Sequence, residues 1–169
     1  MPYRDVMTEV QKLFYQQNRD YNTVDLRNLK GSYKLLLIPN QIMMEPEMAE
    51  TVRSYVRDGG TVIMTGNSAV VDETGKVFGV PRPGYLTDVF GIQIGGYYRT
   101  NMDWTFGEES EIYDSHGEKR EYLTVVREGE SCRIAPDCYE VILPKGAQVW
   151  AEFAGKDFPA VTVNTYGKG

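Results

Sequence analysis

Apolar residues in the first half of the chain recur at the spacings of amphipathic helices. Residues 2–18, PYRDVMTEVQKLFYQQN, place apolar positions three and four residues apart, which predicts a helix with one apolar face. Residues 45–60, EPEMAETVRSYVRDGG, repeat this pattern and end in a glycine pair that is typical of a helix C-terminus. The expected inward positions are Val6, Val10, Leu13 and Phe14 in the first helix and Met48, Val52, Tyr55 and Val56 in the second.

Two short apolar runs flank the second helix. Residues 35–38 in YKLLLIPN are apolar at every position, as a strand covered on both faces requires, and TVIMT at 61–65 is a second run of this kind. A strand, a helix and a strand joined this closely predict a right-handed βαβ crossover. We therefore expect Leu36 and Ile63 to lie in one parallel sheet, with helices on its faces.

From Ile92 onward, the pattern changes to strict alternation. A short helix in GYLTDVFGI, stopped by Gly91, precedes this β-rich half. The expected strands are IQIGGYY (92–98), EYLTVVRE (121–128), YEVILP (139–144), AQVWAEF (147–153) and PAVTVNTYG (159–167). Residues 100–121 are polar and charged, and they are interpreted as an insert.

Both ends of the sequence suggest a part of a longer polypeptide. A doubly wound sheet begins with a strand, whereas this sequence opens on a helix, and VNTYGKG at 163–169 stops where a further strand is expected. We interpret residues 1–169 as one domain of a longer chain.

Charge and residue usage exclude several classes of function. The net charge is −6 with a pI near 4.9, so the basic surface that nucleic acids or anionic lipids require is missing. No apolar run approaches the roughly 20 residues that span a bilayer. We expect neither a nucleic-acid partner nor a membrane partner.

The chain also has little material for metal or cofactor chemistry. Its two cysteines, Cys132 and Cys138, suit either a hairpin disulfide or two semi-buried thiols, and they cannot alone form a four-ligand zinc site. The one histidine, His116, lies in a polar stretch. Gly75 in DETGK belongs to no phosphate-binding motif. We predict no metal and no cofactor.

Three stretches, in this order, resemble one known family. They are YKLLLIPNQIMMEPEMAETVRSYVRDGGTVIMTGNSAVVDETGKV (33–77), GYLTDVFGIQI (84–94) and YEVILPKGAQVWAEFAGKDFPAVTVNTYGKG (139–169). They are similar to the β-galactosidase trimerisation domain of family 42 glycoside hydrolases. Residues 97–131 match nothing in that family.

The resemblance implies a fold and a role. It implies an α/β fold with a flavodoxin-like, class I glutamine amidotransferase-like three-layer core around a parallel sheet, followed by the β-rich half. It also implies a homotrimer, and a separate TIM barrel that hydrolyses terminal β-galactosides. A barrel needs about 250 residues, so we expect the glycosidase site to lie outside these 169 residues, which would then contain no catalytic residue.

Ser68 in TGNSAV occupies the position of a nucleophile elbow. Amidotransferases of the resembled fold carry G-x-C-x-G after such a strand. Here Gly66 fits the first glycine, Ser68 falls on the cysteine, and Val70 replaces the last glycine. A β-branched residue crowds the strained turn, and His116 as a base lies in an unmatched segment. We interpret Ser68 as a turn or helix cap bonded to the amides of its own turn, and keep an amidohydrolase nucleophile as the alternative.

Aromatic residues near the insert raise a third hypothesis. Tyr97, Tyr98, Trp104 and Phe106 could stack on a sugar ring, although aromatics in β-rich domains are more often core or interface residues. The sequence thus favours a structural oligomerisation domain over an amidohydrolase or a carbohydrate-binding module.

Overall fold

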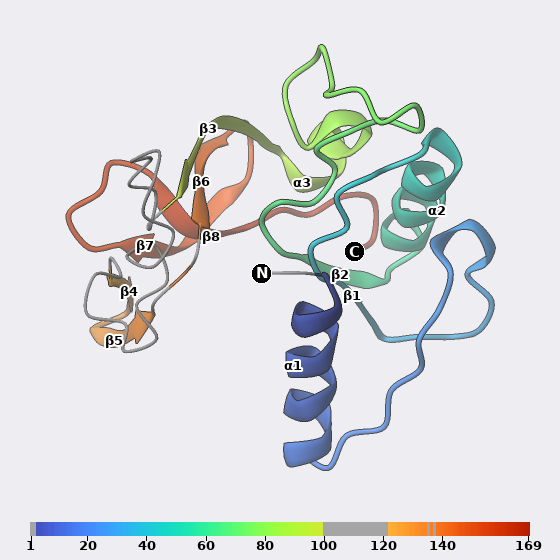
Figure 1. Ribbon diagram of the computed structural model, residues 1–169, viewed down its shortest axis with the longest axis horizontal. Coiled ribbons are helices and arrows are strands. Elements are labelled where there is room, and N and C mark those ends of the chain that lie inside the picture. Colours follow the sequence, from blue (N-terminus) through green and yellow to red (C-terminus); the bar gives the residue numbers. More distant parts are fainter. Residues whose placement is uncertain (1–2, 100–121, 135, 137) are drawn as a thin grey trace, which may run out of the picture.

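The computed structural model describes residues 3–99, 122–134, 136 and 138–169. Figure 1 shows β1, β2 and α2 beside the β-rich half, with α1 projecting from the molecule. The helices are α1 (Tyr3–Gln16), α2 (Pro46–Arg57) and α3 (Thr87–Phe90), with 3₁₀ helices η1 (Leu26–Asn28) and η2 (Gly84–Leu86). The strands are β1 (Leu35–Ile38), β2 (Thr61–Met64), β3 (Ile92–Arg99), β4 (Leu123–Arg127), β5 (Glu130–Ile134), β6 (Cys138–Pro144), β7 (Gln148–Phe153) and β8 (Pro159–Val163).

The β1–α2–β2 unit is the one that the sequence predicts. The two strands pair in parallel, with Leu36 opposite Val62 and Leu37 opposite Ile63, which confirms that Leu36 and Ile63 share a sheet. Helix α2 begins with Pro46 in its first turn, where the missing N–H has no intrahelical acceptor to lose. It ends before Gly59, whose φ of 109° suits glycine.

The hydrophobic core lies between this unit and the segments that cover α2. One face of β1 and the inner face of α2 are buried together, with residues from η1, η2 and α3. The buried residues of this core are Leu26, Leu36, Ile38, Met44, Met48, Ala49, Val52, Val56, Ala69, Leu86 and Val89.

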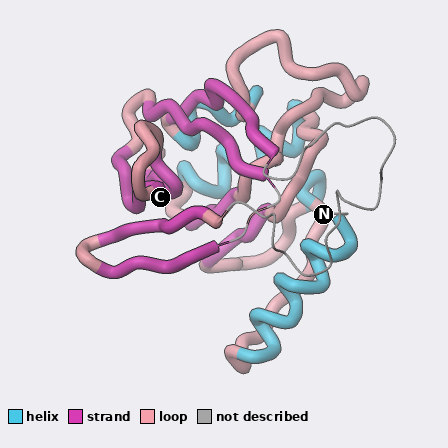
Figure 2. The backbone as a smooth tube through the Cα atoms, turned by 60° about the vertical axis from the view of Figure 1, so that its left-hand side comes forward, coloured by secondary structure: helices cyan, strands magenta, loops and turns pink. Residues whose placement is uncertain are grey.

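The β-rich half forms two antiparallel sheets. Strands β3 and β6 pair, with a register shift between Ile94 and Gly96 that leaves Gly95 as a bulge. Strands β5, β4, β7 and β8 form a second sheet in that order. In Figure 2 these strands fold into long hairpins beside the helical part.

The predicted flavodoxin-like, amidotransferase-like three-layer core is wrong. Among the described residues the one parallel sheet has two strands, and the sheets of the β-rich half are antiparallel. The apolar runs predicted strands buried on both faces, yet Leu35 and Ile63 are 44% and 50% exposed. Strands β3–β8 pair with one another instead of extending the parallel sheet, so the outer face of β1 and β2 stays open.

Helix α1 stands apart from the core. In both views it extends away from the other elements (Figures 1 and 2), and from Val6 onward none of its side chains is buried. Its C-terminus is a Schellman motif: the Asn18 N–H donates to the Tyr15 carbonyl and the Arg19 N–H to the Phe14 carbonyl. Asn18 has the left-handed φ of 50° that this motif needs.

Two sequence-based predictions have different outcomes here. The polar insert at 100–121, which contains Trp104, Phe106 and His116, lies outside the described residues. Cys132 and Cys138 are both free thiols, so the disulfide alternative is not what the structure shows.

Within the described part of the chain, no helix has the length and apolar content that a bilayer crossing requires.

Candidate functional site

Ser68 lies in a tight turn that follows β2. Its neighbours Asn67 and Ala69 both have left-handed φ, 61° and 52°. Ser68 is 4% exposed, and its Oγ accepts a hydrogen bond of 3.0 Å from the Gln41 backbone N–H. The sequence predicts a bond with an amide of the Ser68 turn itself. The structure instead shows one with an amide in the loop after β1. The hydroxyl therefore joins the loops at the carboxyl ends of both parallel strands.

Further hydrogen bonds join the same two loops. The Asn40 N–H donates to the Thr65 hydroxyl at 2.9 Å, and the Asn67 side-chain amide donates to the Asn40 side-chain oxygen at 2.8 Å. The Ala69 N–H donates to the Gln41 carbonyl at 2.8 Å. Ligands of open α/β sheets bind at the carboxyl ends of the strands. At this end, these polar groups are engaged in holding the loops together.

Gly66 and Val70 complete the elbow position that the sequence singles out. The turn continues into an extended segment, where Val71 forms a parallel bridge with Met43, and not into the helix of a nucleophile elbow. The Val70 N–H donates to the Ile42 carbonyl at 2.7 Å. The strand–turn–helix geometry that exposes a nucleophile is therefore absent from this turn.

A small cavity lies beneath the Ser68 turn. Its volume is about 60 Å³, and it is lined by Met64, Thr65, Gly66, Ser68, Pro83, Ile92, Ile94, Glu140 and Ile142. Pockets for small molecules measure about 300–1,000 Å³, whereas one water occupies about 30 Å³ in the liquid. The cavity has room for one or two waters and none for a sugar ring. Its lining includes one carboxylate and neither a histidine nor a lysine.

Glu140 is the titratable residue of this cavity, and no motif in the sequence marks it. Its side chain is 10% exposed, and Oε1 lies 3.2 Å from Nη1 of Arg82. Burial raises the pKa of the Glu140 carboxyl above its usual value, against the opposing effects of the Asn67 N–H and of Arg82. Within the described residues no hydrogen bond joins Glu140 to Ser68, so the carboxylate does not activate that hydroxyl here.

Two residues of the predicted aromatic cluster, Tyr97 and Tyr98, are neighbours on β3. Successive residues of a strand point to opposite sides of the sheet, so the two tyrosine side chains lie on different sides. In the pairing of β3 with β6, Tyr97 is opposite Glu140 and Tyr98 is opposite Tyr139. Tyr98 stacks on Tyr139 with ring centroids 5.4 Å apart, and Tyr139 stacks on Phe158 at 6.0 Å. The other two members, Trp104 and Phe106, lie outside the described residues.

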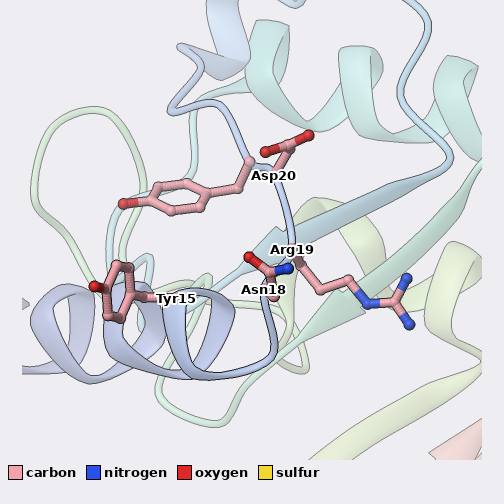
Figure 3. A pocket seen from close by; sticks show the side chains of 5 residues that line it. Tyr15, Asn18, Arg19 and Asp20 are labelled. Atoms are coloured by element: carbon pink, nitrogen blue, oxygen red, sulfur yellow. The ribbon is translucent and has the colours of Figure 1, made fainter.

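A larger hollow of about 410 Å³ lies at the C-terminus of α1. Figure 3 shows Tyr15, Asn18, Arg19 and Asp20 around it, with the Arg19 side chain extending away from Tyr15. All of these side chains are exposed, and the hollow contains no buried polar group. No group of His, Cys, Asp or Glu side chains in the described residues is arranged to hold a metal ion.

Comparisons with known proteins give a consistent result. The sequence model of the family described as "Beta-galactosidase trimerisation domain" matches residues 4–169. The β-galactosidase BgaP of Planococcus sp. (strain L4) is 30% identical over 98% of this chain and 24% of its own length. The β-galactosidase Pbg of Clostridium perfringens is 29% identical over 94% of this chain and 22% of its own.

Solved structures agree with these relatives. A β-galactosidase from Bacillus circulans sp. alkalophilus matches the whole chain with a TM-score of 0.81 at 24% identity, over 24% of its own length. A β-galactosidase from Rahnella sp. R3 matches 81% of the chain and 19% of its own, with a TM-score of 0.66 at 28% identity. The chain thus spans about a quarter of the length of the curated relatives that it matches.

Proposed function

This chain belongs to the β-galactosidase trimerisation domain family, and on that premise we propose that it is a non-catalytic oligomerisation domain of a β-galactosidase. It assembles three copies of the full-length protein into a homotrimer. Hydrolysis of terminal β-galactosides belongs to a TIM barrel elsewhere in that protein. Residues 1–169 act as one domain of the longer polypeptide, with 100–121 as a polar insert.

One observation carries this proposal. The family match covers residues 4–169, while the same residues correspond to only 22–24% of the curated β-galactosidases. The remaining three quarters of such a protein leave ample length for a catalytic barrel of about 250 residues.

The chemistry of the described residues supports a non-catalytic role. Retaining glycosidases place two carboxyl groups about 5 Å apart in a site that accommodates a sugar. The cavity beneath the Ser68 turn offers Glu140 as its single carboxylate, in a volume of about 60 Å³. Neither the second carboxylate nor the space for a galactoside is available there.

We assign Ser68 a structural role and no nucleophilic one. Its buried Oγ accepts a hydrogen bond from the Gln41 amide, and among the described residues no hydrogen bond joins it to Glu140, the carboxylate that lines the cavity. A serine hydroxyl without a base is a poor nucleophile at neutral pH. Stacking of sugars on Tyr98 stays a weaker proposal, because Tyr139 already occupies one face of its ring.

Activity assays test the division of labour. The full-length protein is expected to hydrolyse an aryl β-galactoside, whereas the 169-residue chain hydrolyses neither that substrate nor aryl amides and esters. A matched Ser68→Ala variant of the full-length protein is expected to keep its β-galactosidase activity. Turnover of any of these substrates by the isolated chain, lost on Ser68→Ala substitution, contradicts the proposal.

A further inference from the structure

Ser68 carries a buried hydrogen-bond donor. The residue is 4% exposed, and its hydroxyl oxygen accepts from the Gln41 N–H at 3.0 Å. A serine hydroxyl also has one O–H to donate, and no hydrogen bond within the described part of the chain takes that proton. Leaving a buried donor unmet costs free energy, and folded proteins pair almost all such groups with protein atoms or with ordered water. The Ser68 O–H therefore needs an acceptor in the cavity that this residue lines.

Glu140 brings an acceptor to the same cavity. Its side chain is 10% exposed, and Nη1 of Arg82 lies 3.2 Å from Oε1. The other oxygen, Oε2, lies beside the Ser68 turn, because a Cβ added at Gly66 would be 3.4 Å from it. A carboxylate oxygen can accept more than one hydrogen bond. Donor and acceptor thus line one cavity, and among the described residues no direct bond joins them.

The size of the cavity decides what can connect the two groups. A bound water needs at least about 10–15 Å³ and two or more polar partners, whereas pockets for small molecules measure about 300 Å³ or more. The volume of about 60 Å³ suits water. The described residues contain no group of three His, Cys, Asp or Glu side chains that could hold a metal ion, so a cation would lack ligands here. Water also has the right chemistry, since it accepts from a hydroxyl and donates to a carboxylate.

We propose that the cavity beneath the Ser68 turn is a binding site for one structural water, which accepts the Ser68 O–H and donates to Glu140 Oε2. This inference goes beyond the oligomerisation role and does not depend on it. The water joins the turn after β2 to β6, and so connects the two halves of the domain. It also fills the space beside the hydroxyl that a substrate carbonyl would need, in agreement with a structural role for Ser68.

A crystal structure of the full-length protein tests the site directly. The expected result is one density peak in the cavity at hydrogen-bond distance, about 2.5–3.2 Å, from both Ser68 Oγ and Glu140 Oε2. An empty cavity, a direct bond between the two side chains, or a peak bonded to only one or to neither of them overturns the proposal. A peak with about six or more oxygen ligands at about 2.3–2.6 Å also overturns it, because such a shell identifies a calcium ion.

Hydrogen exchange at the Gln41 amide of the full-length protein is an independent test. The water holds the Ser68 hydroxyl in the orientation that accepts from this amide, so loss of the acceptor of the water loosens the bond. Glu140→Met removes that acceptor with a side chain of similar length, and it is expected to make exchange about 2–10 times faster. Arg82→Met is the matched control, because it removes the partner of Oε1 and keeps Oε2. It is expected to leave the exchange rate nearly unchanged.

The two variants separate the water from the ion pair. Equal acceleration in both variants would show that the Glu140–Arg82 pair controls the turn, and would overturn the proposal. Unchanged exchange in Glu140→Met would overturn it too, since the carboxylate would then have no connection to Ser68. Should Glu140→Met fail to fold, the crystal structure of the unmodified protein still decides. None of these results bears on the oligomerisation role, which the molar mass of the full-length protein tests.

Discussion

Substitution of Ser68 by alanine separates a structural hydroxyl from a catalytic one. The change removes the acceptor of the Gln41 N–H, which donates to Ser68 Oγ at 3.0 Å in a partly buried site. A buried donor left without a partner costs about 1–3 kcal/mol. Water can enter the adjacent cavity of about 60 Å³ and compensate part of this loss, so we expect a cost in the lower half of that range, about 1–2 kcal/mol.

The assay for this prediction is hydrogen exchange at the Gln41 amide, followed by mass spectrometry in the full-length protein. A local loss of 1–2 kcal/mol corresponds to exchange that is about 5–30 times faster. Ser54→Ala is the matched control, because the Ser54 hydroxyl donates to the Glu50 carboxylate and accepts from the Arg57 guanidinium, and neither partner is a backbone amide. Unchanged exchange at Gln41 together with a loss of enzyme activity would refute the structural role of Ser68.

Two further predictions concern stability, measured by urea unfolding of the 169-residue chain. Burial raises the pKa of the Glu140 carboxyl in the folded state, so the folded state holds this proton more tightly than the unfolded state does. The free energy of unfolding is therefore expected to fall as the pH rises from about 4.5 through the folded-state pKa. Glu140→Gln is expected to lessen that fall, and an identical pH dependence in both proteins would contradict this role of Glu140. Gly91→Ala is expected to destabilise the fold by more than the roughly 1–2 kcal/mol of an alanine in the left-handed conformation, because the new Cβ would lie 2.8 Å from Cγ of Asn164. In the control Gly75→Ala the new Cβ meets no atom within 4 Å, so only the cost of the left-handed backbone is expected. Equal losses of stability at the two glycines would contradict the predicted contact with Asn164.

Local sequence signals predicted the β1–α2–β2 unit well. Pro46 at the helix start, the Gly59–Gly60 pair at its end and the apolar periodicity between them all act within a few residues. The pairing of the two strands follows from the short connections around one helix. These features do not depend on the rest of the chain, and for that reason they are readable from the sequence.

Local sequence signals did not predict how the remaining strands pair. An apolar run such as Leu35–Ile38 indicates a strand that favours burial, but it does not say which element covers each face. In this structure β3–β8 pair among themselves, and one face of β1 and β2 stays open. The three-layer prediction failed at this step, where tertiary packing decides.

In the candidate site, too, local sequence predicted the turn but not the long-range contacts that it makes. The turn at Ser68 was recognisable from TGNSAV, yet its partner Gln41 lies 27 residues away, and only the fold reveals it. Glu140 sits in an alternating segment where its polar side chain reads as solvent-facing. Its burial results from packing of β6 against the loop after β2, and the sequence carries no short-range signal for that contact.

The molar mass of the full-length protein with and without residues 1–169 tests the central claim most directly. Sedimentation equilibrium is expected to give the mass of three chains for the intact protein and of one chain after deletion of this domain. A trimer that survives the deletion would contradict the account, as would an intact protein that remains a single chain at every concentration.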